Sequence, residues 1–145
     1  MEVTTYSFTD LAGSISHPTF GAYLFDGTGI GSVTISKATD RTAHDVAADG
    51  SVMVSKIAGN NGTVTIEVQQ TSSLHKWLSA WFNVLWQLPT SEWASTSMTL
   101  RNTATGTRHI ISGISPQKEP DTSYQSQGQR VSWTLMCAEI TNLPI

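Results

Sequence analysis

The chain has 145 residues, enough for one domain with a core of its own. Charged residues make up 13% of it and the net charge is −3, so the sequence carries no basic patch of the kind that binds nucleic acid tightly. A composition this low in charge and rich in Ser and Thr favours a surface that is buried against copies of the same chain.

The cysteine content and the absence of long apolar segments bear on where the protein assembles. The single cysteine, Cys137, excludes an intramolecular disulfide and is typical of a protein assembled in a reducing cytosol. Residues 1–9 lack the basic start and apolar run of a signal peptide. No segment is long and apolar enough to span a bilayer, so we expect no membrane insertion.

The first 31 residues contain few regular patterns. Residues 1–20 are polar, with Pro18 as a stop, and we expect an N-terminal arm there. Residues 21–31 hold a short apolar run followed by glycines at positions 27, 29 and 31. A dinucleotide-binding loop needs a third glycine three residues after the second and then a helix, whereas a β-pattern follows here. We therefore predict a turn or bulge rather than a phosphate site.

Residues 37–49 form a polar segment with charges of both signs, which in an isolated protein is a solvated loop or long hairpin. Asp49-Gly50 is a turn signal, and Gly59-Asn60-Asn61-Gly62 is a second. Between and after these turns apolar residues alternate with polar ones, which predicts a hairpin from Ser51 to Val68. One face of this hairpin is apolar; the other carries Ser51, Ser55, Thr63, Thr65 and Glu67, with Met53 as an exception.

The strongest periodic signal lies between Ser72 and Pro89. Apolar residues recur there at steps of three and four, which predicts a helix over about residues 73–88, capped by Ser72 or Ser73 and ended by Pro89. Its predicted core-facing stripe consists of Leu74, Trp77, Leu78, Trp81, Phe82 and Leu85. Such a stripe needs a large apolar partner, and the other segments are typical of strands, so the partner should be a sheet.

Trp86 lies outside this stripe, on the flank of the helix beside His75 and Ser79. Either a loop of its own chain covers it, or it is an anchor for a neighbouring subunit, since tryptophan is enriched at interfaces.

The C-terminal third predicts more β-structure. Residues 97–100 and 107–111 flank a Thr105-Gly106 turn, residues 115–129 form a long polar loop, and apolar residues alternate from Val131 to Cys137. The expected fold is mainly β: a single domain over residues 1–145, built as an antiparallel β-sandwich or open barrel with one flanking α-helix.

No catalytic, metal or cofactor site is predicted. The four histidines are scattered without the spacing of metal ligands, and Cys137 falls inside an apolar strand pattern typical of a buried thiol. We expect a protein that is not an enzyme.

The run A-D-G-S-V-M-V-S-K-I-A-G-N-N-G-T-V-T-I-E-V-Q-Q-T-S-S, Ala48 to Ser73, resembles a family of phage tail structural proteins. Tyr6 to Pro18 and the strand with Trp133 match the same family more weakly, and the helix departs from it in its high Trp content. The family is that of the tail tube proteins of contractile-tailed phages. The resemblance implies a small β-sandwich with a flanking helix, hexameric rings stacked into a tube inside a sheath, and double-stranded DNA passing through the lumen on infection. Tail sheath, baseplate and terminator proteins would be the partners, and the location would be the tail of a virion assembled in the host cytoplasm.

Within that resemblance the candidate residues acquire roles. The lumen-facing candidates are Ser51, Ser55, Thr63, Thr65 and Glu67, because hydroxyls and carboxylates lack the positive charge that holds phosphates. The ring-stacking candidates are Asp40, Arg41, His44 and Asp45, and Trp86 is the subunit-interface candidate. Alternatives are a tail terminator or baseplate ring, the tube of a contractile secretion apparatus, or a carbohydrate-binding β-module that uses exposed tryptophans.

Overall fold

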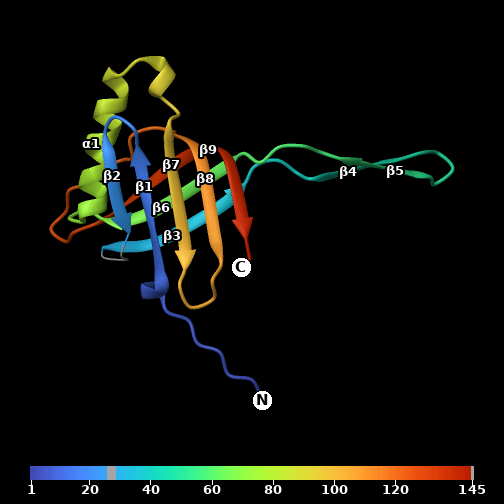
Figure 1. The fold of residues 1–145 in the computed structure, drawn as a ribbon, viewed down its shortest axis with the longest axis horizontal. Helices are drawn as coiled ribbons and strands as arrows, with labels where there is room; N and C mark the ends of the chain where they lie inside the picture. Colours follow the sequence, from blue (N-terminus) through green and yellow to red (C-terminus); the bar gives the residue numbers. More distant parts are fainter. Residues whose placement is uncertain (26–28, 145) are drawn as a thin grey trace.

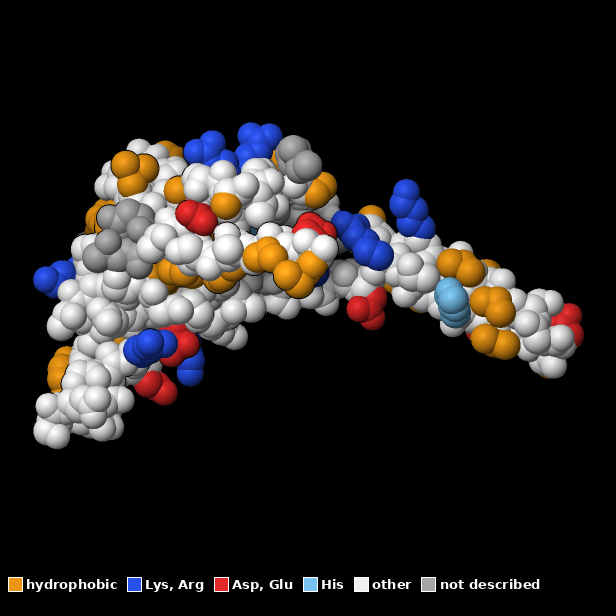
Figure 2. Space-filling model, turned by 90° about the horizontal axis from the view of Figure 1, so that it is seen from below, with side chains coloured by type: hydrophobic (Ala, Val, Ile, Leu, Met, Phe, Trp, Pro, Cys, Tyr) orange, Lys and Arg blue, Asp and Glu red, His pale blue; other side chains and the backbone are white. Residues whose placement is uncertain are grey.

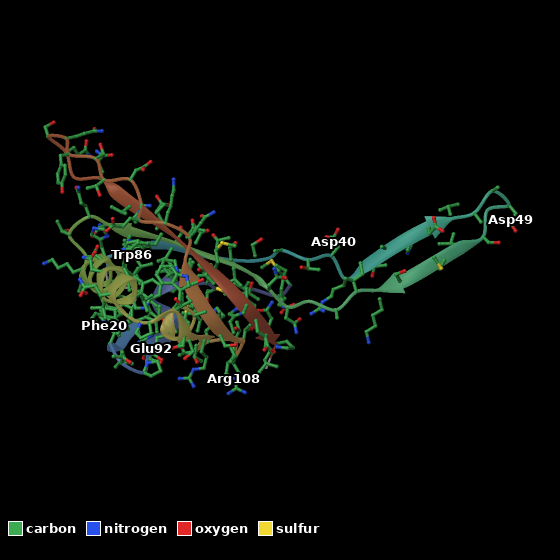
Figure 3. The ribbon with its side chains drawn as sticks, turned by 90° about the horizontal axis from the view of Figure 1, so that it is seen from above. Phe20, Asp40, Asp49, Trp86, Glu92 and Arg108 are labelled. Carbon is green, nitrogen blue, oxygen red and sulfur yellow. The ribbon has the colours of Figure 1, made fainter. Side chains whose placement is uncertain are left out.

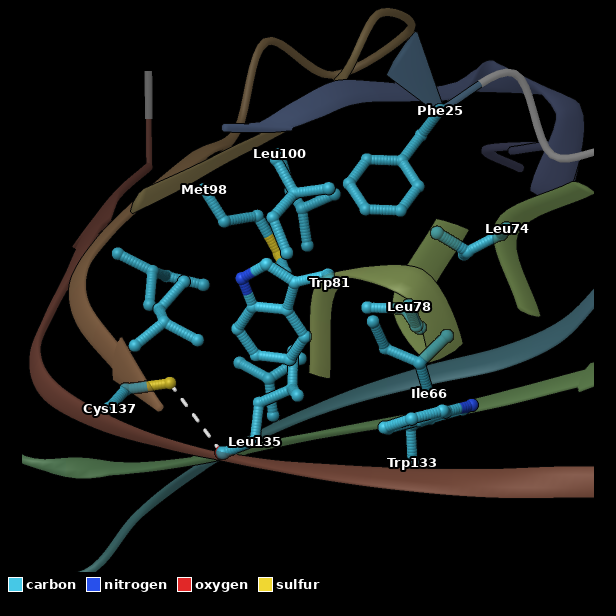
Figure 4. Close-up of a cluster of buried hydrophobic side chains, with 14 of the residues drawn as sticks. Phe25, Ile66, Leu74, Leu78, Trp81, Met98, Leu100, Trp133, Leu135 and Cys137 are labelled. Atoms are coloured by element: carbon cyan, nitrogen blue, oxygen red, sulfur yellow. Dashed lines mark hydrogen bonds between the residues drawn. The ribbon is translucent and has the colours of Figure 1, made fainter. Parts of the chain in front are cut away.

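The computed structural model describes residues 1–25 and 29–144. Within them, seven antiparallel strands form one strongly curved sheet in the order β2-β1-β7-β8-β9-β6-β3. The predicted mainly β fold is thus confirmed, as an open half-barrel that wraps around one helix (Figures 1 and 4). The strands of this sheet are β1 (Leu11–His17), β2 (Gly21–Phe25), β3 (Ile30–Lys37), β6 (Gly62–Gln69), β7 (Thr96–Asn102), β8 (Arg108–Pro116) and β9 (Arg130–Leu143).

The two edges of the sheet are consecutive in the chain. β2 ends at Phe25 and β3 begins at Ile30. The residues between them can span at most about 18 Å, so at this end the edges must curl toward each other. Gly27 of the predicted glycine turn lies outside the described residues. Gly31 lies in a bulge, because the register with β6 shifts between Ile30 and Ser32.

Helix α1 (Ser73–Gln87) fills the hollow of the half-barrel. Its first turn is capped as predicted, because the Ser72 hydroxyl accepts a hydrogen bond from the backbone N–H of His75. The short 3-10 turn η2 (Thr90–Glu92) follows it and leads into β7. Four of the six predicted core residues of the helix are buried, and Trp77 and Phe82 are partly buried against the same core.

The core lies between the helix and the inner side of the strands. Trp81 is fully buried (Figure 4). Its indole N–H donates to the Thr96 hydroxyl over 2.9 Å. The strand residues that face the helix alternate with outward-facing residues along each strand, as a sheet with one buried side requires. They include Ile66, Met98, Leu100, Trp133, Leu135 and Cys137.

The remaining two strands form a separate hairpin that extends far from the body (Figure 1). β4 (Thr42–Val46) pairs with β5 (Val52–Lys56), and neither belongs to the main sheet. The predicted hairpin from Ser51 to Val68 is therefore wrong: β6 pairs instead with β3 and β9. We call residues 42–56 the projecting hairpin. Its first strand and most of its turn lie in residues 37–49, the segment that we expected to be a solvated loop or long hairpin, and its second strand lies beyond that segment.

Two further boundaries differ from expectation. The predicted N-terminal arm of residues 1–20 is shorter, because the 3-10 turn η1 (Phe8–Asp10) and β1 follow residue 7 directly. The sequence did not predict β1, because a strand in which only Ile15 and His17 are fully buried lacks a regular alternation of apolar and polar residues. The polar loop after β8 covers residues 117–129, since Ser115 and Pro116 end that strand.

Candidate functional site

A broad patch rich in hydroxyl groups covers the outer side of β3 and β6 and of the first half of β9. Directly paired residues of antiparallel strands share a face, so the register defines the patch row by row. Thr65 lies between Thr34 and Thr134, and Glu67 lies between Ser32 and Ser132. We call this set of outward residues the hydroxyl face: Ser32, Thr34, Ser36, Thr63, Thr65, Glu67, Gln69, Arg130, Ser132, Thr134 and Met136.

Only part of the predicted lumen set belongs to this face. Thr63, Thr65 and Glu67 lie together on β6, opposite the core-facing residues of the same strand. Ser51 and Ser55 lie instead on the projecting hairpin, because β5 pairs with β4. The alternation that identified β6 is repeated in residues 32–36 and 132–136, and this repeated pattern was the sequence signal for the rest of the face.

Two opposite charges on the hydroxyl face lie beside each other. Arg130 is a diagonal neighbour of Glu67 across β6 and β9, and its Nη1 is 3.8 Å from Glu67 Oε1. The Ser32 hydroxyl donates to the other carboxylate oxygen, Oε2, over 3.4 Å. The guanidinium lies against Gly31, where an added Cβ would be 2.7 Å from Nη1. The bulge glycine therefore leaves the space that Arg130 occupies beside Glu67.

The projecting hairpin has an apolar face with no core beneath it. Val46 pairs with Val52 and His44 with Val54, so these four side chains share one side. Val54 is 62% exposed, and Figure 2 shows hydrophobic side chains gathered beside a histidine on the hairpin. An isolated two-stranded hairpin is at best marginally stable in water, so a face of this kind needs a partner.

The turn of the hairpin is built by Asp49 and Gly50. Gly50 has a positive φ of 91°, and its N–H donates to the Ala47 carbonyl. The backbone N–H of Ser51 donates to Asp49 Oδ1 over 3.0 Å, and this hydrogen bond lowers the pKa of the Asp49 carboxyl.

A joint of irregular chain connects the projecting hairpin to the body through residues 38–41 and 57–61. The Arg41 guanidinium donates to the Asn60 side chain and to the Ile57 carbonyl, and the Thr39 hydroxyl donates to Asn61 Oδ1. Of the four predicted ring-stacking residues, Arg41 thus turns back to its own chain. Asp40, His44 and Asp45 are exposed.

Trp86 is exposed at the end of the molecule remote from the projecting hairpin (Figure 3). Its side chain is 75% exposed, so among the described residues no loop covers it. Its ring meets Trp93 edge-on with centroids 6.2 Å apart, and the two line a hollow of about 400 Å³ with Leu85, Leu88 and Thr90. We therefore keep the other interpretation as a prediction: Trp86 is an anchor for a neighbouring subunit.

His17, His75 and Cys137 make structural contacts. His75 accepts a hydrogen bond at Nδ1 from the Trp133 indole over 3.1 Å, and burial lowers the pKa of its imidazole. Burial also raises the pKa of the Cys137 thiol to about 11, which leaves it protonated and unreactive at neutral pH. Buried His17 bonds the Glu92 carbonyl through Nε2 and accepts from the Thr19 and Phe20 N–H groups at Nδ1.

Two features are absent from the part of the chain that the structure describes. None of its helices has the length and apolarity needed to cross a membrane. Its His, Cys, Asp and Glu side chains form no cluster of three or more that could hold a metal ion.

The half-barrel with its helix is similar to proteins of contractile injection machines. A chain in the structure of the anti-feeding prophage baseplate matches with a TM-score of 0.67 at 9% identity, over 99% of this chain and 97% of that chain. A chain in the sheath-tube complex of the extracellular contractile injection system PVC has a TM-score of 0.58 at 12% identity, over 97% and 93%. A chain in the PVC sheath/tube terminator has a TM-score of 0.59 at 11% identity, over 98% of each. The fold is therefore tail-tube-like.

No curated protein matches the chain in sequence. The family model of the bacteriophage PhiTE tail tube protein, however, matches residues 3–143. The chain belongs to this family of phage tail tube proteins. It is a structural protein of a phage tail rather than an enzyme, and the family places it in the tail of the virion.

Proposed function

We propose that the protein forms hexameric rings that stack into the tube of a contractile phage tail, and that double-stranded DNA passes through the lumen. The observation that carries this proposal is the hydroxyl face, a broad outer surface of a sheet with one Glu and one Arg among its residues. The tube would assemble in the host cytoplasm with sheath, baseplate and terminator proteins as partners.

The hydroxyl face suits a channel that must not hold DNA. Non-specific affinity for DNA comes from Lys and Arg that neutralise phosphates, and the hydroxyls that make up most of this face offer no such charge. If each of six subunits contributed the three strands of this face, β3, β6 and β9, and the neighbouring β8, the wall would have about 24 strands. At a tilt of about 40° its circumference is roughly 150 Å and its diameter roughly 48 Å, which leaves room for a duplex after side chains are subtracted.

The projecting hairpin is the proposed contact between rings. Its valine face has no partner among the described residues, and exposed Asp40, His44 and Asp45 supply polar groups that can fix the register of a contact. Trp86 is proposed to meet a second copy of the chain. Trp86 and the projecting hairpin lie at opposite ends of the molecule. Each copy can therefore contact one neighbour through Trp86 and another through the hairpin, and such contacts, repeated from copy to copy, build rings or tubes.

Electron microscopy of the purified protein at raised concentration tests this assembly. The expected result is long tubes with a regular axial repeat and a hollow centre. A protein that stays monomeric at every concentration in which the sheet is folded would contradict the proposal.

The lumen assignment has its own test in tailed particles that carry Glu67→Lys. Glu67 is solvated, so this variant should still fold and assemble, but the channel should retain DNA and slow its ejection, most strongly at low salt. Ejection at the normal rate in low salt would mean that Glu67 does not face the channel.

A second candidate is a single ring at the end of a tail, either a terminator or a baseplate component. The likeness to chains from the anti-feeding prophage baseplate and the PVC terminator favours it, since these chains share the fold. The tube of a secretion apparatus is a related alternative. Rings that do not elongate under the same conditions would support the end-ring function over the tube.

A further inference from the structure

We propose that Glu67 neutralises Arg130 and thereby keeps the channel wall from binding DNA phosphates. This inference rests on the proposed function of the hydroxyl face. It assigns to the pair a role that neither side chain has alone: the carboxylate holds a guanidinium that would otherwise face the passing duplex.

The pair contributes little to folding. Its side chains are 59% exposed for Arg130 and 41% for Glu67, and ion pairs this open to water are weak. Its effect on a polyanion is larger, because exposed Arg is the side chain that most readily forms bidentate contacts with phosphate. The formal charges of the hydroxyl face are those of Glu67 and Arg130, so together they leave it neutral.

The surroundings hold the two groups side by side. The Ser32 hydroxyl donates to Glu67 Oε2, which leaves Oε1 turned to the guanidinium. Gly31 leaves free the space that the end of Arg130 occupies, because a Cβ there would lie 2.7 Å from Nη1 and 3.1 Å from Cζ. A larger residue at position 31 would displace the end of the Arg130 side chain and leave the backbone in place.

Removing the carboxylate should release one cation per subunit into the channel. In six copies per ring, these guanidiniums would meet the phosphates of a duplex. If all six make contact, the binding constant for DNA should fall by about 10³-fold between 50 and 200 mM salt, because each neutralised phosphate releases counterions.

The experiment uses tubes of the full chain, assembled with a short labelled DNA duplex and then treated with nuclease to remove DNA outside the lumen. Glu67→Gln tubes should protect far more DNA than wild-type tubes at 50 mM salt and lose it at 200 mM. The double variant Glu67→Gln/Arg130→Gln should return to the wild-type level. Glu119→Gln makes the same charge change on the helix side of the molecule, in the 117–129 loop, and should have no effect.

A second route leaves both charges in the chain. Gly31→Ala should displace the guanidinium from its position beside Glu67 and raise DNA retention in the same salt-dependent way. This variant tests the inference even if Glu67→Gln tubes fail to assemble. The inference is overturned if Glu67→Gln and Gly31→Ala tubes both behave as wild type while Glu67→Lys tubes retain DNA, and equally if the double variant still retains it. If Glu67→Lys tubes also retain none, the hydroxyl face does not meet DNA, and the proposed lumen itself fails.

Discussion

Trp81 is the side chain on which the packing of the helix depends most. It is fully buried, and its indole N–H is satisfied by the Thr96 hydroxyl. Trp81→Ala should lower the free energy of unfolding by about 3–5 kcal/mol, because the cavity cannot collapse in a closely packed core. Urea unfolding of the monomer measures this loss, with yield of soluble protein as a first indication.

Trp86→Ala is the matched control, since it removes the same side chain from the same helix on its exposed side. Its stability should stay within about 0.5 kcal/mol of the wild type. Equal losses for the two variants would contradict the burial of Trp81.

His75 gives the fold a predicted dependence on pH. Burial lowers the pKa of its imidazole in the folded state, so the unfolded chain binds a proton more readily. Stability should therefore be complete above the unfolded pKa of about 6.5 and decrease as the pH falls from there toward the lower folded pKa. Unfolding measured between pH 8 and pH 5 tests this.

The control for this pH dependence is His75→Gln. A Gln side-chain oxygen can still accept the hydrogen bond from the Trp133 indole but does not titrate in this range. The decrease in stability between pH 7 and pH 5 should be smaller in this variant. An unchanged decrease would assign the effect to other groups.

Among the elements, the projecting hairpin is the one whose removal should spare the fold. Its strands pair only with each other, while β3 and β6 keep their partners in the main sheet. Replacing residues 42–56 by a short Gly-containing turn should leave a cooperatively folding body that forms no long tubes. Thermal unfolding followed by circular dichroism and electron microscopy measure the two effects.

A milder variant separates the apolar face from the length of the hairpin. Val46→Thr, Val52→Thr and Val54→Thr together keep β-branched residues on the strands but reduce the apolar surface. If valine contacts hold the rings together, this triple variant should also impair tube growth. Tubes of normal repeat from either variant would mean that the hairpin does not stack rings.

The elements that the sequence predicted well have their signal within one segment. The helix follows from its own period and from Ser72, which caps it, and the β7–β8 hairpin follows from the Thr105-Gly106 turn between its strands. The prediction that failed was the pairing of strands. Val52 and Val54 alternate like the buried Val64 and Ile66, but alternation does not say which strand lies alongside, and β5 pairs with β4 rather than β6.

Part of the hydroxyl face was predictable because its signal also lies within one segment. Thr63, Thr65 and Glu67 follow from the alternation in β6 alone. Their neighbours on β3 and β9 depend on pairing across long stretches of sequence, as does the Arg130–Glu67 contact, which joins residues 63 positions apart. Gly31 was expected to mark a turn or bulge, but its role beneath Arg130 depends on the three-dimensional contact.

At the scale of the whole molecule, the two apolar patches lie at opposite ends, and the proposed assembly needs both. Trp86→Ser should leave the monomer folded and weaken association, because an exposed aromatic anchor is lost from the interface. The concentration at which tubes appear should rise, as measured by sedimentation and electron microscopy.

Tyr124→Ser is the comparison for this prediction, since Tyr124 is another exposed aromatic residue and lies in the polar 117–129 loop. It should change the concentration for assembly less than Trp86→Ser does. An unaltered concentration for Trp86→Ser would remove Trp86 from the interface.

The position of β9 has a consequence for synthesis of the protein. β9 is the last strand in the chain, yet it lies between β8 and β6 and is the strand that joins the two parts of the sheet. While the ribosome is still making the chain, β8 and β6 each present an unpaired edge and apolar residues without cover. The half-barrel can therefore close only once β9 has left the ribosome, and a chain terminated before β9 keeps both edges unpaired and its core uncovered.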